Sequence, residues 1–296
     1  MVVTFEPDIA RLRVVLESVA TQVDSIVVVD NGSSNRDQVA ALLAAVSGAS
    51  FEQLAANLGI GAALNSGADW HVARGQDWLL TLDQDTALHA GAVSEVLREL
   101  DLMPDWLRRS TAVVGMSRGL APPQGRRRRW VERSLVVAEH GLFTERLNVI
   151  TSGNLVRAEV FGSVRYEEKF FMDHVDTRFC ADVRRAGRRV LEYRRATMDH
   201  RLGATVQLRR GPRVYERGDR IYYITRNGFA LVARGDLPLR VFLRDVVGLS
   251  SVYVECNGAR SFRACLRLVA RGILDGATKR FGPRPSLSRS ASRGRQ

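Results

Sequence analysis

An alternation of apolar and helical segments over the first 83 residues constrains the fold most strongly. VVTF, SIVVVD and WLLTL are largely apolar runs at positions 2–5, 25–30 and 78–82. The segments between them repeat apolar residues at helical spacing. Apolar strands that alternate with helices are typical of a parallel sheet covered by helices on both faces. We therefore predict an α/β fold for this half of the chain.

Polar residues mark the carboxyl ends of these strands, where parallel sheets bind their ligands. Asp83 and Asp85 in LDQDT are two residues apart, so in an extended chain their side chains point the same way. Two adjacent carboxylates repel each other unless a cation lies between them. Mg²⁺ or Mn²⁺ prefers oxygen ligands and is often shared with substrate phosphates. A second interpretation is that Asp85 or Thr86 caps a helix over 89–100.

Other polar residues also allow two interpretations each. Asp30, at the end of VVVD, can accept a hydrogen bond from a pyrimidine imide or a ribose hydroxyl, or it can simply begin a turn. Asp176 in FFMDHVD is a candidate general base or a first-turn helix residue, and Asp173 competes with it on spacing. His200 is structural or completes a metal shell.

Composition limits the class of protein. The 296 residues are 45% hydrophobic with a net charge of +12, which suggests anionic partners such as nucleic acid, anionic lipid or phosphorylated substrates. The three cysteines are scattered, and we expect reduced, buried thiols. Met1 leads directly into VVTF, so we expect no signal peptide, although a longer chain could begin upstream. No apolar run is long enough to span a membrane.

The second half is less regular. A Pro- and Gly-containing loop at 118–133 carries four arginines at 126–129, and the chain from about 216 to 280 is expected to be helical. Arginines alternate there with apolar residues, which is typical of a membrane-surface helix or of a solvated helix face. We predict three parts: a catalytic domain over 1–215, with a nucleotide-binding half of about 1–116 and an acceptor half of about 117–215; a helical region over 216–282; and a disordered basic tail over 283–296.

Nine motifs in a fixed order resemble one family. The chain is similar to family 2 glycosyltransferases of the GT-A fold, and most closely to their rhamnosyltransferase branch. The matching motifs are VVTFEPD, VVVDNGS, NLGIGAALNSG, LDQDT, ITSGNLV, FFMDHVDTRF, RRAG, DHRLG and YYITRN, which span residues 2 to about 228.

The resemblance implies a GT-A nucleotide-diphospho-sugar transferase fold, in which a mostly parallel Rossmann-like sheet is flanked by helices and followed by a helical C-terminal region. It also implies a role for each residue that matches a motif. By similarity, Thr4, Glu6 and Asp30 hold the nucleoside, Asn57 and Asn65 lie near the ribose and diphosphate, Asp83 and Asp85 bind a metal with His200 as third ligand, Asp176 is the general base, and Arg226 contacts the diphosphate or acceptor. Val175 stands where the family often has a glutamate that binds the acceptor.

The implied function is an inverting transferase that uses Mg²⁺ or Mn²⁺. The expected donor is dTDP-rhamnose, and the expected acceptor is a polyprenyl-diphosphate-linked saccharide or cell-envelope polysaccharide at the cytoplasmic face of an anionic membrane. A UDP-hexose or UDP-galactofuranose donor is the alternative. A basic nucleic-acid-binding protein is a remote one, because the sequence has no recognisable nucleic-acid-binding motif; we expect no nucleic-acid partner. The sequence does not indicate an oligomeric state.

Overall fold

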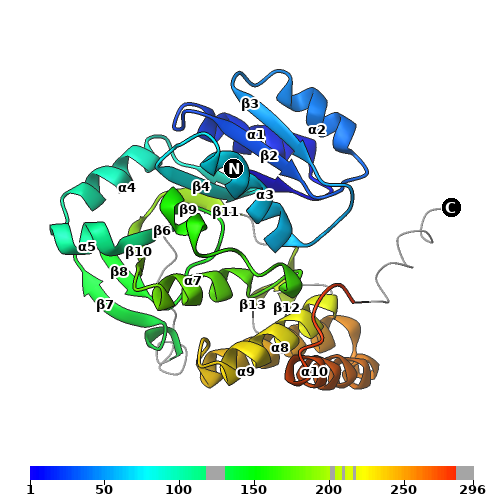
Figure 1. The fold of residues 1–296 in the computed structure, drawn as a ribbon. Helices are drawn as coiled ribbons and strands as arrows, with labels where there is room; N and C mark the ends of the chain where they lie inside the picture. The colour runs from blue at the N-terminus through cyan, green and yellow to red at the C-terminus, as the bar shows by residue number, and fades with distance from the viewer. Residues whose placement is uncertain (118–130, 201–203, 209–210, 216–217, 285–296) are drawn as a thin grey trace.

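The expected strands and helices of the first half are present in the computed structural model of the protein, which describes residues 1–117, 131–200, 204–208, 211–215 and 218–284. Their apolar runs are buried strands because both faces of the sheet are covered. Elements are named as in Figure 1. The first half contains β1 (Val2–Thr4), α1 (Ile9–Ala20), β2 (Ile26–Asp30), α2 (Arg36–Leu43), β3 (Ala49–Gln53), α3 (Ile60–Val72), β4 (Trp78–Asp83), β5 (Thr86–Leu88), α4 (Ala92–Asp101), α5 (Asp105–Ser110) and β6 (Thr111–Ser117).

The second half adds the remaining strands of the main sheet and the C-terminal helices. It contains β7 (Val136–His140), β8 (Phe143–Arg146), β9 (Asn154–Arg157), η1 (Ala158–Gly162), η2 (Glu168–Phe170), α7 (Val175–Arg185), β10 (Arg189–Ala196), β11 (Met198–His200), β12 (Ala204–Leu208), β13 (Gly211–Tyr215), α8 (Gly218–Ala233), α9 (Leu239–Asn257), η3 (Ala259–Ser261) and α10 (Phe262–Ala277).

The main sheet has nine strands in the order β3-β2-β1-β4-β9-β6-β10-β8-β7. The four strands β3, β2, β1 and β4 are parallel, as expected, whereas β9 is antiparallel to both of its neighbours. A hairpin of β7 and β8 adds an antiparallel edge beside β10. Because β1, β2 and β4 run in the same direction, their carboxyl ends, with Thr4, Asp30 and Asp83, lie at one edge of the sheet.

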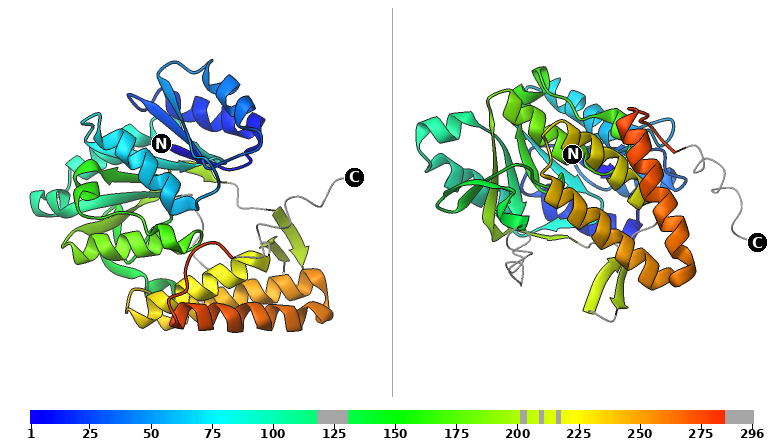
Figure 2. Two further views of the ribbon diagram at one scale, coloured as in Figure 1. Left: turned by 45° about the vertical axis from the view of Figure 1, so that its right-hand side comes forward. Right: turned by 90° about the horizontal axis from the view of Figure 1, so that it is seen from below.

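Each face of the sheet contributes to its own hydrophobic core. Val2 and Val28 pack with the buried residues of α1, α2 and α4 on one face. Val3 and Val29 pack with α3 and α7 on the other face, and that core continues into α8 and α9. Figures 1 and 2 show α8, α9 and α10 side by side at the end of the molecule opposite α2 and β3. The C-terminal helices are therefore joined to the sheet through apolar packing.

Helices α8 and α10 pack closely because glycines face α8. A Cβ atom at Gly276 would lie 2.6 Å from the carbonyl oxygen of Arg226, and one at Gly272 would lie 2.9 Å from that of Tyr222. The hydroxyl of Tyr222 also donates to the buried carboxylate of Asp275 at 2.9 Å. These contacts fix α10 against α8.

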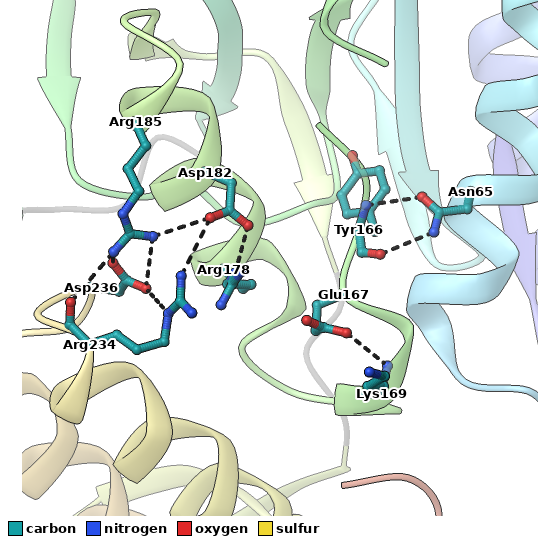
Figure 3. Close-up of polar contacts among 9 residues, drawn as sticks. All are labelled: Asn65, Tyr166, Glu167, Lys169, Arg178, Asp182, Arg185, Arg234 and Asp236. Carbon is teal, nitrogen blue, oxygen red and sulfur yellow. Dashed lines mark hydrogen bonds and ion pairs between the residues drawn. The ribbon is translucent and has the colours of Figure 1, made fainter. Parts of the chain in front are cut away.

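An ion-pair network joins α7 to the loop between α8 and α9 (Figure 3). Asp236, which is buried, accepts hydrogen bonds from Arg185 and from Arg234. Asp182 on α7 pairs with Arg178 at 2.6 Å. Since α7 also carries Asp176, the network fixes the helix that presents this carboxylate.

Several expectations need correction or fall outside the described residues. Thr86 lies in β5 and pairs with β11, and α4 begins after Gly91 without a side-chain cap, so the capping role expected of Asp85 or Thr86 was wrong. Cys256 is exposed, whereas Cys180 and Cys265 are buried as expected. The arginines at 126–129 and residues 285–296 of the tail lie outside the described residues. Within the described part of the chain, no helix is both long and apolar enough to cross a membrane.

Candidate active site

A cavity of about 610 Å³ opens at the edge where β1 and β4 end. Its walls come from those strand ends, the start of α3, the loop before α7, the first turn of α7 and the first turn of α8. The residues that carry its chemistry are Thr4, Asn57, Asp83, Asp85, Asp173, His174, Asp176 and Arg220. Four predicted carboxylates share this cavity, and their contacts indicate which role each can have.

Asp83 and Asp85 lie at the β4 end of the cavity. The backbone N–H of Asp83 donates to Ser152 Oγ at 2.9 Å, and Arg11 holds the backbone carbonyl of Asp85 at 2.7 Å. Burial, followed by the negative charges of Asp85 and Asp176, raises the pKa of Asp83 to about 7. Carboxylates in this arrangement favour a bound cation, because a cation offsets both the cost of burying their charge and the repulsion between them.

Asp176 faces the same cavity from the first turn of α7. One oxygen of its carboxylate accepts a hydrogen bond from the backbone N–H of Thr177 at 2.7 Å. Burial raises the pKa of Asp176 above its ordinary value, while the charge of His174 opposes the shift. A raised pKa makes a carboxylate a stronger base than an exposed one, which suits proton abstraction near neutral pH.

The loop before α7 has an unusual backbone. Three of its residues have positive φ angles, which residues other than glycine rarely adopt. These angles are 65° at Phe171, 58° at Asp173 and 60° at His174. Asn227 on α8 holds this loop by donating from Nδ2 to the carbonyl oxygens of Phe170, Met172 and Asp173 at 3.1, 2.8 and 2.9 Å. The conformation that presents Asp173 and Asp176 thus depends on a residue from the C-terminal region.

Asp173 competes with Asp176 as a base on spacing, but its contacts differ. Arg220 donates to the Asp173 carboxylate from Nη2 at 2.5 Å and from Nε at 3.0 Å. This carboxylate is therefore already engaged in an ion pair, whereas the Asp176 carboxylate accepts only from the backbone N–H and hydroxyl of Thr177 among the described contacts. The geometry therefore favours Asp176 as the base.

Arg226 does not reach the cavity. Its side chain is buried and donates to the carbonyl oxygens of Phe170 at 2.8 Å and Gly282 at 2.7 Å, and to Asn227 Oδ1 at 2.9 Å. The structure places it as a brace between α8, the loop before α7 and the end of the described chain. The expected contact of Arg226 with a diphosphate or acceptor has no geometric basis here.

The residues expected to hold the nucleoside mostly brace loops. Asp30 is fully buried and accepts from Thr4 Oγ1 at 3.0 Å and from the backbone N–H of Ser33 at 2.8 Å. Glu6 accepts from the backbone N–H and the hydroxyl of Ser34, both at 2.8 Å. Thr4 lines the cavity, whereas Asp30 and Glu6 shape the loop beside it.

The two asparagines near the start of α3 have different positions. Asn57 lines the cavity, and its Oδ1 accepts from Asn31 Nδ2 at 3.1 Å and the Gly59 N–H at 3.0 Å. Asn65 is buried, is not among the lining residues and pairs with the backbone N–H and carbonyl of Tyr166, each at 3.0 Å (Figure 3). Asn65 therefore anchors the segment that leads to the loop before α7.

The third expected metal ligand is only partly described. The backbone of His200 pairs with Thr86 in the two-stranded sheet of β11 and β5, directly after Asp85. Its side chain lies outside the described residues. Within the described part of the chain, no group of three His, Cys, Asp or Glu side chains is arranged to hold a metal. Asp83 and Asp85 alone would leave most positions of a divalent cation to substrate oxygens and water.

Sequence reasoning missed the contributions of Ser152, Arg220 and Asn227. The ITSGNLV and YYITRN motifs contain Ser152 and Asn227, so their motif membership was a signal for two of them. Arg220 belongs to no motif, and only the fold brings it to the cavity.

Comparison with known proteins identifies the family. A model of the family described as "Glycosyl transferase family 2" matches residues 1–189. The chain belongs to this family. It is therefore a glycosyltransferase, and the resemblance inferred from its motifs is confirmed.

Relatives extend this assignment. The dTDP-rhamnosyl transferase RfbF of Shigella flexneri is 25% identical over 257 residues, which cover 83% of this chain and 83% of the relative. S. aureus TarS 1–349 has a TM-score of 0.52 at 13% identity, over 94% of this chain and 80% of that one. A longer S. aureus TarS structure has a TM-score of 0.50 at 16% identity, over 87% and 44%. The glycosyltransferase therefore has the GT-A fold.

Proposed function

We propose that this glycosyltransferase moves rhamnose from dTDP-rhamnose onto a polyprenyl-diphosphate-linked saccharide of the cell envelope, with inversion at the anomeric carbon. The observation that carries the proposal is the convergence of Asp83, Asp85 and Asp176 on one cavity at the strand ends. The choice of sugar rests on the similarity to a dTDP-rhamnosyl transferase. A UDP-hexose or UDP-galactofuranose donor is the alternative within the same mechanism.

Asp176 accepts the proton of an acceptor hydroxyl as its oxygen attacks the anomeric carbon of the donor. The new carbon–oxygen bond forms on the face opposite the diphosphate. The bond from the anomeric carbon to the diphosphate oxygen breaks, and its electron pair leaves with the nucleoside diphosphate. One such displacement inverts the anomeric configuration. Asn227 and the ion pairs of α7 keep the Asp176 carboxylate in place for this step.

The donor set at the end of β4 fits Mg²⁺ or Mn²⁺. Asp83 and Asp85 supply hard oxygen ligands. The pKa of Asp83 is raised by burial and then by the negative charges of Asp85 and Asp176, which a cation would offset. We propose His200 as a third ligand because its backbone lies beside Thr86. When bound, such an ion neutralises charge on the departing diphosphate. Asn57 and Thr4 line the same cavity and are proposed to contact the nucleotide.

We propose that the region over 216–282 contacts an anionic membrane surface at the cytoplasmic face, where a lipid-linked acceptor would be found. On α9, Leu239, Leu243 and Val247 are spaced four residues apart and are exposed by 50–64%. Helix α10 exposes Phe262 and Leu266 by 53% and 51%. Arginines flank them on both helices, and basic amphipathic helices bind anionic bilayers.

Vesicle sedimentation tests the membrane contact. Substitutions Leu243→Glu and Leu266→Glu should reduce binding to vesicles that contain anionic lipid, whereas Leu102→Glu, an exposed change near α4, should not. Equal binding of all three proteins would refute the membrane contact and leave the transferase proposal intact.

A donor panel tests the transferase activity. Purified protein with Mg²⁺ or Mn²⁺ is given dTDP-rhamnose, UDP-glucose, UDP-galactose, UDP-galactofuranose or GDP-mannose, with and without a polyprenyl-diphosphate disaccharide. We expect acceptor-dependent release of dTDP from dTDP-rhamnose alone. Release from a uridine donor would retain the mechanism and replace the sugar.

A further inference from the structure

The cavity wall carries negative charge, which would repel a diphosphate unless cations lie nearby. Asp83, Asp85 and Asp176 line it, together with Asp173, whose charge is already paired with Arg220. A nucleoside diphosphate brings further negative charge, and like charges at close range repel strongly in a partly buried site. One divalent cation between Asp83 and Asp85 offsets only part of this charge. We therefore expect a second cation close to the phosphates.

Arg220 is the one arginine or lysine among the described residues that line this cavity. It comes from the first turn of α8, in the C-terminal region. The side chain of Asp173 is 7% exposed and that of Arg220 38% exposed. The guanidinium is thus fixed at one edge by a buried carboxylate and remains accessible from the cavity.

We propose that Arg220 binds a phosphate group of a diphosphate substrate, with Asp173 as the residue that positions its guanidinium. This proposal rests on the proposed function. Two diphosphates enter the reaction, that of the nucleotide sugar and that of the lipid-linked acceptor, and Arg220 has the chemistry to bind either. We assign it to the donor because Arg220 shares the cavity with Asp83 and Asp85, the proposed metal ligands.

The other arginines close to this edge have different tasks. Arg226 is 1% exposed, and its guanidinium is used by backbone carbonyls. Arg11 donates to the carbonyl oxygen of Asp85 and is not among the lining residues. The YITRN motif suggested a diphosphate contact for Arg226. Arg220, which lines the cavity, is better placed for that contact.

The chemistry of the pair favours arginine at this position. A guanidinium is planar and charged at all physiological pH values, and it presents N–H donors at several edges. One edge can remain on a carboxylate while another meets a phosphate. Lysine has the same charge but carries its three N–H donors on one nitrogen, so it lacks the planar edges with which a guanidinium holds both partners in a fixed geometry.

Binding measurements with dTDP, dTMP and thymidine test the proposal. By calorimetry with Mg²⁺ present, Arg220→Gln should raise the Kd for dTDP about tenfold or more, the typical loss for one charge-assisted hydrogen bond. The Kd for thymidine should not change. Arg220→Lys should give an intermediate value for dTDP. Circular dichroism and thermal unfolding identify any variant that fails to fold.

Arg165 supplies a matched control. It pairs with Asp69 at 2.6 Å, its side chain is 39% exposed, and it lies outside the cavity. Arg165→Gln therefore removes an equally exposed arginine from an ion pair and should leave the Kd for dTDP unchanged. Asp173→Asn should raise this Kd in the same direction as Arg220→Gln, because the guanidinium loses its anchor.

The outcomes separate the two diphosphates and the two proposals. An unchanged Kd for dTDP with a raised KM for the lipid-linked acceptor at saturating donor would overturn the donor assignment and place the acceptor diphosphate at Arg220. No change in either quantity would overturn the role of Arg220. A wild-type protein that binds neither dTDP nor UDP would contradict the proposed function itself.

Discussion

The side-chain amide of Asn227 donates a hydrogen bond to the backbone carbonyl of Asp173 at 2.9 Å. This bond joins the middle of α8 to a loop in which Asp173 has a φ angle of 58°. The same amide also donates to Phe170 and Met172. A loop with this backbone is maintained only when its surroundings specify it. The C-terminal helices thus contribute to the geometry of the cavity as well as covering the sheet.

Asn227→Ala should therefore weaken both stability and catalysis. One buried and two partly buried carbonyl groups lose a donor, which should lower the free energy of unfolding by about 2 kcal/mol. The loop should relax, so kcat should fall, and the Kd for dTDP should rise as well because this loop carries Asp173, which positions Arg220. Asn257→Ala, an exposed change at the end of α9, is the control in urea unfolding. Wild-type kcat in a folded Asn227→Ala protein would show that the loop does not need this brace.

Two glycines of the C-terminal helices should respond oppositely to alanine: one substitution should lower the stability of the protein and the other should raise it. Gly276→Ala places a Cβ 2.6 Å from the backbone oxygen of Arg226. A backbone atom cannot move aside cheaply, so we expect a loss of about 1–3 kcal/mol. Gly248→Ala in α9 meets no heavy atom within 4 Å and should stabilise the helix by about 0.5–1 kcal/mol. Thermal unfolding of the two variants checks the predicted difference in sign.

Asp83 predicts a pH dependence of stability in the metal-free protein. Its folded pKa of about 7 lies above the ordinary value of 3.8. Between these two values the folded state binds a proton that the unfolded state has lost. Stability should therefore fall as the pH rises from about 4 to about 7, and remain reduced above it.

Asp83→Asn removes this titration, so the variant should have a Tm higher than that of wild type by about 2 °C or more at pH 8 without metal. The two Tm values should converge towards pH 4. Thermal unfolding in EDTA across this range provides the measurement. A difference that grows as the pH falls would mean that the Asp83 carboxylate is stabilised, not destabilised, by its surroundings. Added Mg²⁺ should raise the Tm of wild type more than that of Asp83→Asn.

The first half of the fold could be predicted because its signals are local. SIVVVD was predicted as a strand over 25–30, and β2 spans Ile26–Asp30. Strand β4 likewise begins at Trp78, as predicted. Buried parallel strands carry unbroken apolar runs, so period and length are sufficient to find them. The antiparallel β9 was missed because NLVR is short and its pairing with β4 and β6 joins distant segments.

The sequence was sufficient to predict the carboxylates of the site but not the roles of its arginines. Asp83 ends β4, Asp85 follows it and Asp176 lies in the first turn of α7, and all three belong to motifs that the sequence showed. Arg226 is 56 residues from Phe170 in sequence yet bonds its carbonyl, and no periodicity encodes such a contact. The capping interpretation of Asp85 and Thr86 also failed because pairing of β5 with β11 replaced the local rule.

In the proposed mechanism, the cavity lined by Asp83 and Asp176 performs the transfer. Acceptor-dependent release of dTDP from dTDP-rhamnose tests it most directly, with Asp83→Ala and Asp176→Asn beside an Asp69→Asn control outside the cavity. We predict that kcat falls by about 10²-fold or more in both cavity variants, as expected for loss of a charge-stabilising group or a general base. The control should retain wild-type kcat. A folded Asp176→Asn protein that releases dTDP at the wild-type rate would contradict the role of Asp176 as the general base.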